Sequence, residues 1–383
     1  KKNMSLKKIR LSFFSGSRSE FDIISNVIEK AQNINEFETT LIVSGNHLKK
    51  IKKNKIKKIF KINLAKKDNT KETYYSSVIS EVIIKITNKL KYLRPDFLIL
   101  HGDRFETLAA AIASSSMNIP TVQLEAGDIT NGGTYDDSVR HAISRLSHIL
   151  FATNQESKKR LIKFGEEEWR IKNFGLSSFD KMHDTNFATT NEIKKKFQIS
   201  LNKPIILFTF HPSSIDYKKT YSNLKICLKS LDKFKKNVDI IITYPNNDLG
   251  SKIIIDEYKK NNKFKIYESL GKHFYYGLMS LNLKKVQKVI CAGNSSSGIK
   301  ETPFFHCPTI NIGNRQDGRL QANNVVNVKL NEKLIDNAIK ATLKNNKFNI
   351  KNPYYIENSS IKILKFIKKF KNKKFELLNK KYK

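Results

Sequence analysis

Cysteine and long apolar runs are both scarce in this 383-residue sequence, and each absence excludes a class of protein. The three cysteines, Cys227, Cys291 and Cys307, lie well apart and form no C-x-x-C pair, which argues against a disulfide framework and a zinc knuckle. No apolar run approaches the roughly 18 residues of a membrane helix. The basic start KKNMSLKKIR leads into no signal-peptide core. We therefore expect a cytoplasmic protein without a membrane partner.

The usual nucleotide-binding fingerprints are also missing. The sequence contains neither G-x-G-x-x-G nor G-x-x-x-x-G-K-[ST], so a nicotinamide-dependent enzyme and a kinase lose most of their support. The histidines other than His211 show no metal-like spacing. We expect no metal and no cofactor.

Lysine dominates the charge. The chain has 71 basic and 35 acidic residues and a formal net charge of +36, and ten arginines leave 61 lysines. A basic surface attracts nucleic acid, but these lysines accompany Asn and Ile along the whole chain, without an RNP-like, zinc-finger or helix-turn-helix pattern. We interpret the charge as compositional drift and expect no nucleic-acid partner. The arginines are then informative, because only arginine offers a planar fork to phosphate or carboxylate.

The length suggests two domains. Short apolar runs alternate with helical periodicity from Ile9 to about Asn173, and again from residue 204 onward, which is typical of parallel sheets covered by helices. We predict an α/β protein with two Rossmann-like domains that face a cleft. Residues 1–180 form the first domain, 181–203 a polar linker, 204–356 the second domain, and 357–383 a C-terminal helix with a basic tail that frays.

Small and charged residues follow several of the predicted strands. Gly16, Ser17 and Arg18 open one predicted helix and GNSSSG at 293–298 opens another, where free backbone N–H groups suit an anion. Such turns also simply join strands to helices. His211 follows the predicted strand ILFTF at the mouth of the second domain, where its imidazole could donate to a phosphate or transfer a proton.

Acidic residues gather at the predicted sheet edge of the first domain. Asp103, Glu125 and Asp136 each follow a predicted strand or begin a predicted helix, beside Arg104 and Arg140. Converging carboxylates can have their pKa values driven apart, so that one acts as a base and another as an acid. Helix capping is the alternative explanation, above all for Asp136.

Six motifs together resemble the hydrolysing UDP-N-acetylglucosamine 2-epimerases in order and spacing. They are SGSRSEFD at 15–22, HGDRFETLAAAIA at 101–113, EAGD…DDSVRHAISRLSH at 125–148, FHP at 210–212, GNSSSGIKE at 293–301 and NIGNRQDGR at 311–319. The likeness runs from about residue 9 to residue 345.

This resemblance implies a fold similar to the B-type glycosyltransferases, with a UDP-sugar between the domains. It also implies a reaction without metal or nicotinamide. UDP-N-acetylglucosamine, or a 4-acetamido-6-deoxy analogue, would lose its C2 proton and UDP to give a 2-acetamidoglucal. Water would then add at C1 while C2 is reprotonated on the opposite face. The product, a free sugar of the N-acetylmannosamine type, would serve sialic- or legionaminic-type acid synthesis. The family also implies a homodimer or a higher homo-oligomer.

The resemblance implies site residues as well. It places Asp103, Glu125, Asp136, Arg140 and His211 in the catalytic set. Positions that would hold the UDP-sugar are Arg18, Glu20, Arg104, Ser295, Ser296, Gly298, Glu301 and Arg315.

Two other enzymes remain as alternatives. GDRFE, DDSVRH and GNSSSGIKE favour the hydrolysing branch, whereas EAG at 125–127 resembles the non-hydrolysing epimerases and leaves the C4 and C6 substituents of the sugar open. A B-type glycosyltransferase would use the same cleft with an acceptor. Free 2-epimer with UDP, a UDP-sugar epimer, or a glycosylated acceptor would separate the three.

Overall fold

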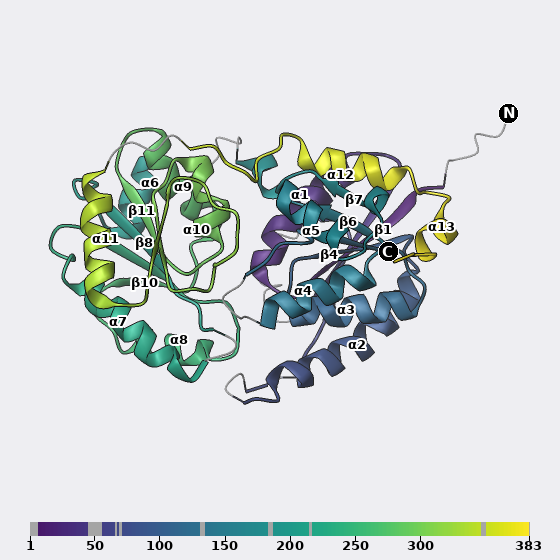
Figure 1. Ribbon diagram of the computed structural model, residues 1–383, viewed down its shortest axis with the longest axis horizontal. Helices are drawn as coiled ribbons and strands as arrows, with labels where there is room; N and C mark the ends of the chain where they lie inside the picture. Colours follow the sequence, from purple (N-terminus) through teal and green to yellow (C-terminus); the bar gives the residue numbers. More distant parts are fainter. Residues whose placement is uncertain are drawn as a thin grey trace.

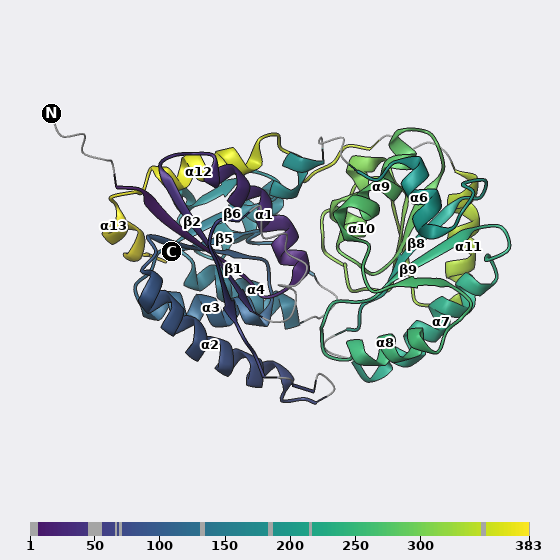
Figure 2. The same cartoon turned by 180° about the vertical axis from the view of Figure 1, so that it is seen from behind.

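Two parallel β-sheets carry the fold, one in each half of the chain (Figures 1 and 2). The computed structural model describes residues 7–44, 56–65, 67–68, 71–130, 135–182, 187–213, 217–345 and 350–382. The strands of the first sheet are β1 (Ile9–Ser15), β2 (Phe37–Ser44), β3 (Ile59–Ile62), β4 (Phe97–His101), β5 (Thr121–Leu124), β6 (Ile149–Ala152) and β7 (Ile171–Asn173). They lie in the order β3-β2-β1-β4-β5-β6-β7.

The second sheet repeats this arrangement with one strand fewer. Its strands are β8 (Ile205–Thr209), β9 (Asp239–Thr243), β10 (Lys265–Tyr267), β11 (Val289–Gly293), β12 (Thr309–Ile312) and β13 (Val325–Val328), in the order β10-β9-β8-β11-β12-β13. In each sheet the order reverses beside the first strand, between β1 and β4 and between β8 and β11. Ligands of open α/β sheets bind beyond the carboxyl ends of the strands at such points. The predicted fold of two Rossmann-like domains is confirmed.

Helices cover both sheets. The first domain has α1 (Arg18–Gln32), α2 (Tyr74–Leu93), α3 (Phe105–Ser116), α4 (Tyr135–Leu146) and α5 (Gln155–Lys163). The second has α6 (Thr190–Phe197), α7 (Thr220–Asp232), α8 (Ser251–Lys259), α9 (Gly271–Leu283), α10 (Ser297–Lys300) and α11 (Glu332–Lys344), and α12 (Ser359–Lys368) and α13 (Lys374–Leu378) end the chain. Short 3-10 helices span Glu168–Arg170, Ser177–Lys181, Tyr217–Lys219 and Thr302–Phe305.

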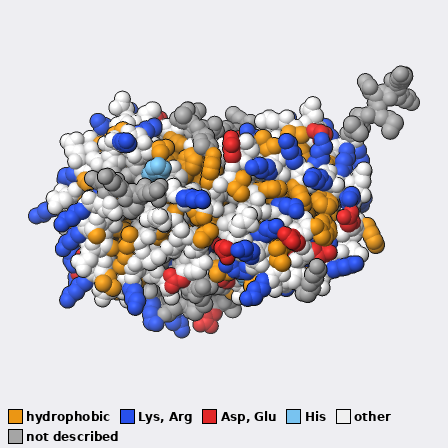
Figure 3. Space-filling view, turned by 45° about the horizontal axis from the view of Figure 1, so that its top comes forward, with side chains coloured by type: hydrophobic (Ala, Val, Ile, Leu, Met, Phe, Trp, Pro, Cys, Tyr) orange, Lys and Arg blue, Asp and Glu red, His pale blue; other side chains and the backbone are white. Residues whose placement is uncertain are grey.

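Apolar patterning explains these elements. Every residue of β4, FLILH, is buried, as expected of a parallel strand covered on both faces. In α2 the buried residues recur at every fourth position from Tyr74 to Leu90, which defines one helix face. Among the described residues, none of the helices combines the length and the apolar character needed to cross a bilayer. Lys and Arg side chains are scattered over the face seen in Figure 3, mixed with acidic and hydrophobic ones.

The segment expected to be a linker contains helix α6. Thr189 and Glu192 form a capping box at its start, and Ile193 and Phe197 are buried in the core of the second domain. Two apolar residues in a lysine-rich eight-residue helix give only a weak periodic signal, which is why the segment resembles a polar linker.

The expectation that the C-terminal tail frays is wrong. Helices α12 and α13 return to the first domain (Figure 1), where Leu377 is fully buried in the core. The Arg170 guanidinium donates to the carbonyl oxygens of Leu377 at 2.8 Å and Asn379 at 3.0 Å. Lys380 Nζ lies 2.6 Å from a carboxylate oxygen of buried Glu166. One apolar anchor and two buried cations therefore fix a segment that reads as basic and polar.

We expect Leu377→Ala to lower the free energy of unfolding by about 2–3 kcal/mol, because it removes a buried side chain from an edge of the core. Urea unfolding followed by circular dichroism measures this change. Phe375→Ala is the matched control, since the Phe375 side chain is 82% exposed and should change stability by less than about 0.5 kcal/mol. Equal effects of the two variants would show that the tail does not pack.

The chain crosses between the domains twice, and the two crossings lie side by side. The Leu176 N–H donates to the Tyr354 carbonyl oxygen at 3.0 Å. The Asp180 carboxylate accepts from the N–H groups of Ser359 at 2.9 Å and Ser360 at 2.7 Å. Gly175 has φ +70°, and a Cβ there would lie 2.7 Å from the Tyr354 carbonyl oxygen, so this position requires glycine. The paired crossings join the domains along one edge.

Candidate active site between the domains

Carboxylates of the first domain meet cations of the second at the carboxyl ends of the strands. Asp103 follows β4 and Glu125 follows β5, while Asp136 lies in the first turn of α4. Facing them from the second domain are Lys300, at the end of α10, and Arg315 and Arg319, in the loop after β12.

Two arginines hold Asp103 in its ionised form. Buried Arg140 forms an ion pair with Asp103, and Arg319 Nη2 lies 3.9 Å from the same carboxylate. Burial favours the neutral acid, but the two guanidinium groups hold the pKa of Asp103 at about 2. Arg140 also pairs with Asp137 and donates to the Asp128 carbonyl oxygen at 3.1 Å, and these contacts fix the orientation of its guanidinium group.

Glu125 lies between a histidine and a lysine. His101 Nε2 is 3.0 Å from one carboxylate oxygen and Lys300 Nζ is 2.7 Å from the other. Burial opposes ionisation, yet these two cations hold the pKa of Glu125 well below its usual range. In return, the negative charge of Glu125 outweighs burial and raises the pKa of His101.

Asp128, which the sequence analysis did not single out, completes this network. Its carboxylate lies 2.8 Å from Lys300 Nζ and 3.2 Å from Arg319 Nε. Although Asp128 is buried, these cations hold its pKa below the usual range. Lys300 and Arg319 therefore each contact two carboxylates of the other domain.

Asp136 differs from the other carboxylates. Burial and the nearby Asp103 charge raise the pKa of Asp136 to about 6, because Arg315 Nη2, at 3.7 Å, offsets them only in part. The neighbouring Asp137 instead anchors the preceding loop, accepting from the Thr130 N–H at 2.8 Å. The pKa values of Asp103 and Asp136 are thus driven apart, as the sequence predicts for converging carboxylates.

His211 is held by the loop that follows β11. Its backbone N–H donates to Asn294 Oδ1 at 2.7 Å, and its carbonyl accepts from Asn294 Nδ2 at 2.8 Å. Burial and the Arg315 charge lower the pKa of His211 to about 3. Its Nδ1 accepts from the Asn246 N–H at 3.3 Å, so the neutral ring carries its proton on Nε2 and can donate there.

The GNSSSG loop lies beside His211. Gly293 has φ +122°, and a Cβ there would lie 1.9 Å from the Thr209 carbonyl oxygen, so no side chain fits. Arg315 Nη1 donates to the Asn294 carbonyl oxygen at 3.1 Å. The remaining predicted residues of this loop are Ser295, whose Oγ accepts weakly from the Ser297 N–H, Ser296, which precedes α10, and Gly298, which packs closely on Thr309.

Glu301 lies in a buried hydroxyl network. Its carboxylate accepts from Ser297 Oγ at 2.7 Å and from the Tyr276 hydroxyl at 3.0 Å. Burial raises its pKa. The hydroxyl partners keep the carboxylate oriented beside the loop.

One expectation about the first loop is wrong. The N–H groups of Gly16 and Ser17 are not free for an anion, because Glu20 Oε2 accepts from both at 2.8 Å. Glu20 Oε1 also accepts from Thr107 Oγ1 at 2.7 Å. Glu20 therefore caps α1. Arg18 begins α1, but its side chain lies outside the described part of the structure.

Arg104 joins the two domains. Its guanidinium Nε lies 3.0 Å from Glu106, and Nη1 lies 2.9 Å from Asp248 in the second domain. Asp248 was not predicted as a site residue, because it lies outside the six motifs. Lys300 and Arg319 do fall within GNSSSGIKE and NIGNRQDGR, and Asp128 within EAGD, so position in a motif could have found these three.

A cavity of about 360 Å³ opens between the domains next to this network. Residues of both domains line this cavity, and Asp128 and Arg319 are among them. Its other polar lining comes from Asn154, Glu156, Ser157, Arg160 and Gln321.

The sequence profile of the UDP-N-acetylglucosamine 2-epimerase family matches residues 29–368. The chain belongs to this family. One relative, the GDP/UDP-N,N'-diacetylbacillosamine 2-epimerase (hydrolyzing) of Campylobacter jejuni, is 34% identical over 341 residues, or 85% of this chain and 86% of that protein. The UDP-N-acetylglucosamine 2-epimerase of Neisseria meningitidis serogroup B is 29% identical over 88% of this chain and 89% of its own length.

Solved structures agree on the architecture of this epimerase. The UDP-GlcNAc 2-epimerase of Neisseria meningitidis, bound to UDP-GlcNAc, superposes with a TM-score of 0.79 at 22% identity, covering 94% of this chain and 99% of that one. The Methanocaldococcus jannaschii enzyme gives a TM-score of 0.78 at 20% identity and covers 94% of this chain and 100% of its own. The resemblance drawn from the six motifs is confirmed, and the chain is an enzyme of the UDP-sugar 2-epimerase type.

Proposed function

We propose that this epimerase is hydrolytic and converts a UDP-2-acetamido sugar and water into UDP and the free 2-epimer. The observation that carries the proposal is the contrast between two neighbouring carboxylates. Arg140 and Arg319 flank Asp103 and keep its pKa low, whereas Arg315 lies 3.7 Å from Asp136 and leaves its pKa raised, which fits a fixed anion beside a proton acceptor. Relatives from Campylobacter and Legionella are named as hydrolyzing 2-epimerases, at 34% and 28% identity.

For the substrate we propose the 4-acetamido-6-deoxy analogue of UDP-N-acetylglucosamine ahead of UDP-N-acetylglucosamine itself. The Campylobacter relative is named for GDP/UDP-N,N'-diacetylbacillosamine and the Legionella relative for UDP-N,N'-diacetylbacillosamine, a sugar that carries these substituents. The Campylobacter identity exceeds that of the Neisseria enzyme. We also propose that the product serves synthesis of sialic- or legionaminic-type acids and that the enzyme is cytoplasmic. The proposed homodimer is tested by light scattering.

The UDP group fits the second domain and the loop after β1. His211 Nε2 and the Arg315 fork are donors suited to the pyrophosphate, with Ser295 and Ser296 beside them. Arg18 would add a charge from the first domain. Glu301, already turned toward hydroxyl groups by Ser297 and Tyr276, suits the ribose hydroxyls.

Asp136 is the group best suited to remove the C2 proton. Asp103 and Glu125 hold protons weakly because cations surround them, whereas the Asp136 carboxylate has a higher proton affinity and is still mostly ionised at neutral pH. The C2–H electron pair forms the C1–C2 double bond as the C1–O bond to UDP breaks. Arg315 stabilises the charge that develops on the leaving group.

The second stage needs a proton on the opposite face of C2 and a water oxygen at C1. His101 suits the proton delivery, because Glu125 raises its pKa and holds its Nε2 at 3.0 Å. The His101 imidazolium gives its proton to C2 as the water oxygen bonds to C1, and the proton that this water loses restores His101. The free 2-epimer results, and Asp136 releases the C2 proton to solvent as UDP leaves. The carboxylates that remain ionised can orient the water.

We expect kcat/KM to rise with pH through about pH 6 and to level off above it, because Asp136 must be ionised to act as the base. Removing the Asp103 charge lowers the pKa of Asp136, so the residual activity of Asp103→Asn should show this rise at lower pH. Initial rates of UDP release between pH 4.5 and 8.5 measure both. A rate that falls through pH 6 would assign Asp136 the role of acid instead.

Proton NMR in D2O tests the reaction itself. With either UDP-sugar, we expect free 2-epimer deuterated at C2 together with UDP, and faster turnover of the diacetamido substrate. A UDP-sugar epimer without free sugar would identify a non-hydrolysing enzyme. Free sugar without deuterium at C2 would contradict proton abstraction.

A further inference from the structure

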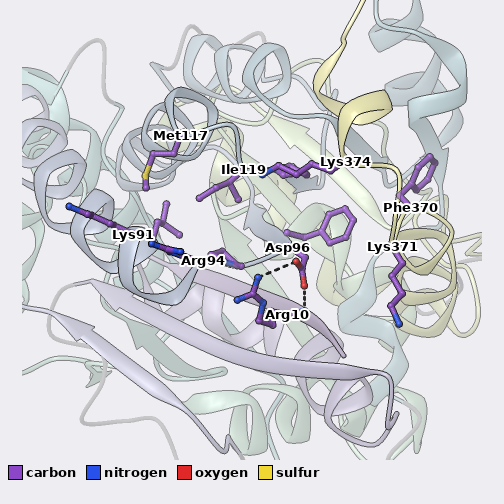
Figure 4. A pocket seen from close by; sticks show the side chains of 13 residues that line it. Arg10, Lys91, Arg94, Asp96, Met117, Ile119, Phe370, Lys371 and Lys374 are labelled. Atoms are coloured by element: carbon purple, nitrogen blue, oxygen red, sulfur yellow. Dashed lines mark hydrogen bonds and ion pairs between the residues drawn. The ribbon is translucent and has the colours of Figure 1, made fainter. Parts of the chain in front are cut away.

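A second cavity lies at the opposite edge of the first sheet from the active site. It has a volume of about 310 Å³ and lies where β1 and β4 begin, where α2 and α3 end, and where the segment from α12 to α13 crosses the domain. Figure 4 shows Arg10, Arg94 and Asp96 at its centre, with Phe370 and Lys371 to one side and Met117 and Lys91 to the other. Three distant parts of the chain therefore build one cavity.

The cavity is strongly cationic. Five cationic side chains line it against one carboxylate, Asp96, which leaves a net charge of +4: Arg10, Lys91, Arg94, Lys371 and Lys374. Asp96 pairs with Arg10 at 3.3 Å and accepts the Arg10 backbone N–H at 2.7 Å. Within the described ranges no carboxylate pairs with the other four cations, although Lys371 does lie near the Glu36 carboxylate.

Arginine use sets this cavity apart from the lysine-rich surface. Only ten arginines occur in the sequence. Seven of them have carboxylate or carbonyl partners elsewhere. Five of these lie at or near the active site: Arg104, Arg140, Arg160, Arg315 and Arg319. The other two, Arg145 and Arg170, contact Glu166 and the C-terminal segment. Arg18 belongs to the proposed UDP site. The remaining two, Arg10 and Arg94, both line this cavity.

The backbone at Arg94 is also unusual. Arg94 is the C-cap residue of α2 with φ +43°, a left-handed conformation that glycine or asparagine adopts at lower cost. Cations at a helix carboxyl end offset its negative partial charge, which accounts for Lys91 and Arg94. That effect does not account for Lys371 and Lys374, which reach the cavity from the C-terminal segment.

We propose that this cavity binds a small phosphate monoester with an aromatic or apolar body. Arginine forks and lysines suit the phosphate. The wall formed by Met117, Ile119 and Phe370 suits the body, and the volume falls at the lower end of the range for ligand sites. β1 and β4 run from the cavity to the loops of the active site at the opposite edge of the sheet, so the two sites are separate. This inference does not depend on the proposed function.

The only tryptophan in the sequence reports on the cavity. The Trp169 and Phe370 ring centroids are 5.7 Å apart, and Phe370 lines the cavity. Adenosine 5'-monophosphate and inorganic phosphate are titrated separately, with saturating UDP present to occupy the active site. We expect a saturable change in Trp169 fluorescence and tighter binding of the nucleotide than of inorganic phosphate.

Arg94→Asn removes the guanidinium but keeps a residue that tolerates the left-handed conformation. We expect it to weaken nucleotide binding at least about tenfold, the loss that corresponds to one charge-assisted hydrogen bond, with unfolding stability unchanged or higher. Lys374→Gln should weaken binding as well. Lys260→Gln, an exposed lysine at the end of α8 in the second domain, should leave it unchanged.

Three results would overturn the proposal. The first is the absence of saturable binding in both fluorescence and equilibrium dialysis. The second is wild-type affinity in both Arg94→Asn and Lys374→Gln. The third is competition between the nucleotide and UDP, which would place the binding in the active site.

Discussion

Replacing Asp136 with asparagine is expected to lower kcat at least about a hundredfold while UDP still binds, because the variant loses the carboxylate that can take a proton near neutral pH. Asparagine keeps the shape of the side chain and the 3.7 Å approach to Arg315. Turnover is followed by UDP release and binding by calorimetry. Similar losses are expected for Asp103→Asn and Glu125→Gln, through the fixed charges that surround the reacting sugar.

The control for this prediction is Asp239→Asn. Asp239 begins β9 and therefore lies at the edge of the second sheet opposite the active site. The same change of charge there should leave kcat within a factor of about two. Wild-type turnover in Asp136→Asn would remove Asp136 from the chemistry.

The largest stability effect is expected at Lys300. Replacing Lys300 with methionine leaves Glu125 and Asp128 buried without the cation that contacts both, so the free energy of unfolding should fall by about 3–5 kcal/mol at pH 7.5. Urea unfolding measures the change. Lys300→Arg keeps the charge and should lose less. Lys260→Met removes an exposed lysine and should change stability by less than about 0.5 kcal/mol.

The pH dependence of this loss has a definite sign. Lys300 helps to hold the pKa values of Glu125 and Asp128 below their usual range, so their ionised forms stabilise the fold above pH 4 or so, the ordinary pKa of these acids. That stabilisation disappears as the pH falls through the depressed values. The difference between Lys300→Met and the wild type should therefore shrink in acid. A difference that grows in acid would show that Lys300 does not act through these carboxylates.

Local sequence signals predicted the fold well because each strand of a covered parallel sheet is a short apolar run between turn residues. The same logic placed Asp103 and Glu125 correctly at the ends of β4 and β5. It did not find Lys300 or Arg319, because their partners Glu125 and Asp128 belong to the other domain. Contacts made by docking two domains leave no periodic trace in either one.

The tail shows a second reason for failure. Residues 374–380, KFELLNK, contain three apolar residues, of which only Leu377 joins the core, and the lysine-rich surroundings of this short run predict fraying. What fixes the segment is Arg170, whose guanidinium binds backbone carbonyl oxygens that every sequence possesses. Because the acceptors are backbone carbonyl oxygens, the sequence of residues 374–380 gives no sign of these hydrogen bonds.

The paired crossings at Leu176–Tyr354 and Asp180–Ser359 have a consequence for the catalytic cycle. Two domains joined along one edge separate by rotation about that hinge. Such a rotation would carry Lys300 and Arg319 away from Glu125, Asp128 and Asp103 together, whereas Arg140 would stay beside Asp103 and His101 beside Glu125. The movement that would admit a UDP-sugar would therefore also separate the carboxylates from two of the cations that hold their pKa values low. Each turnover would then have to bring these cations back by closing the domains.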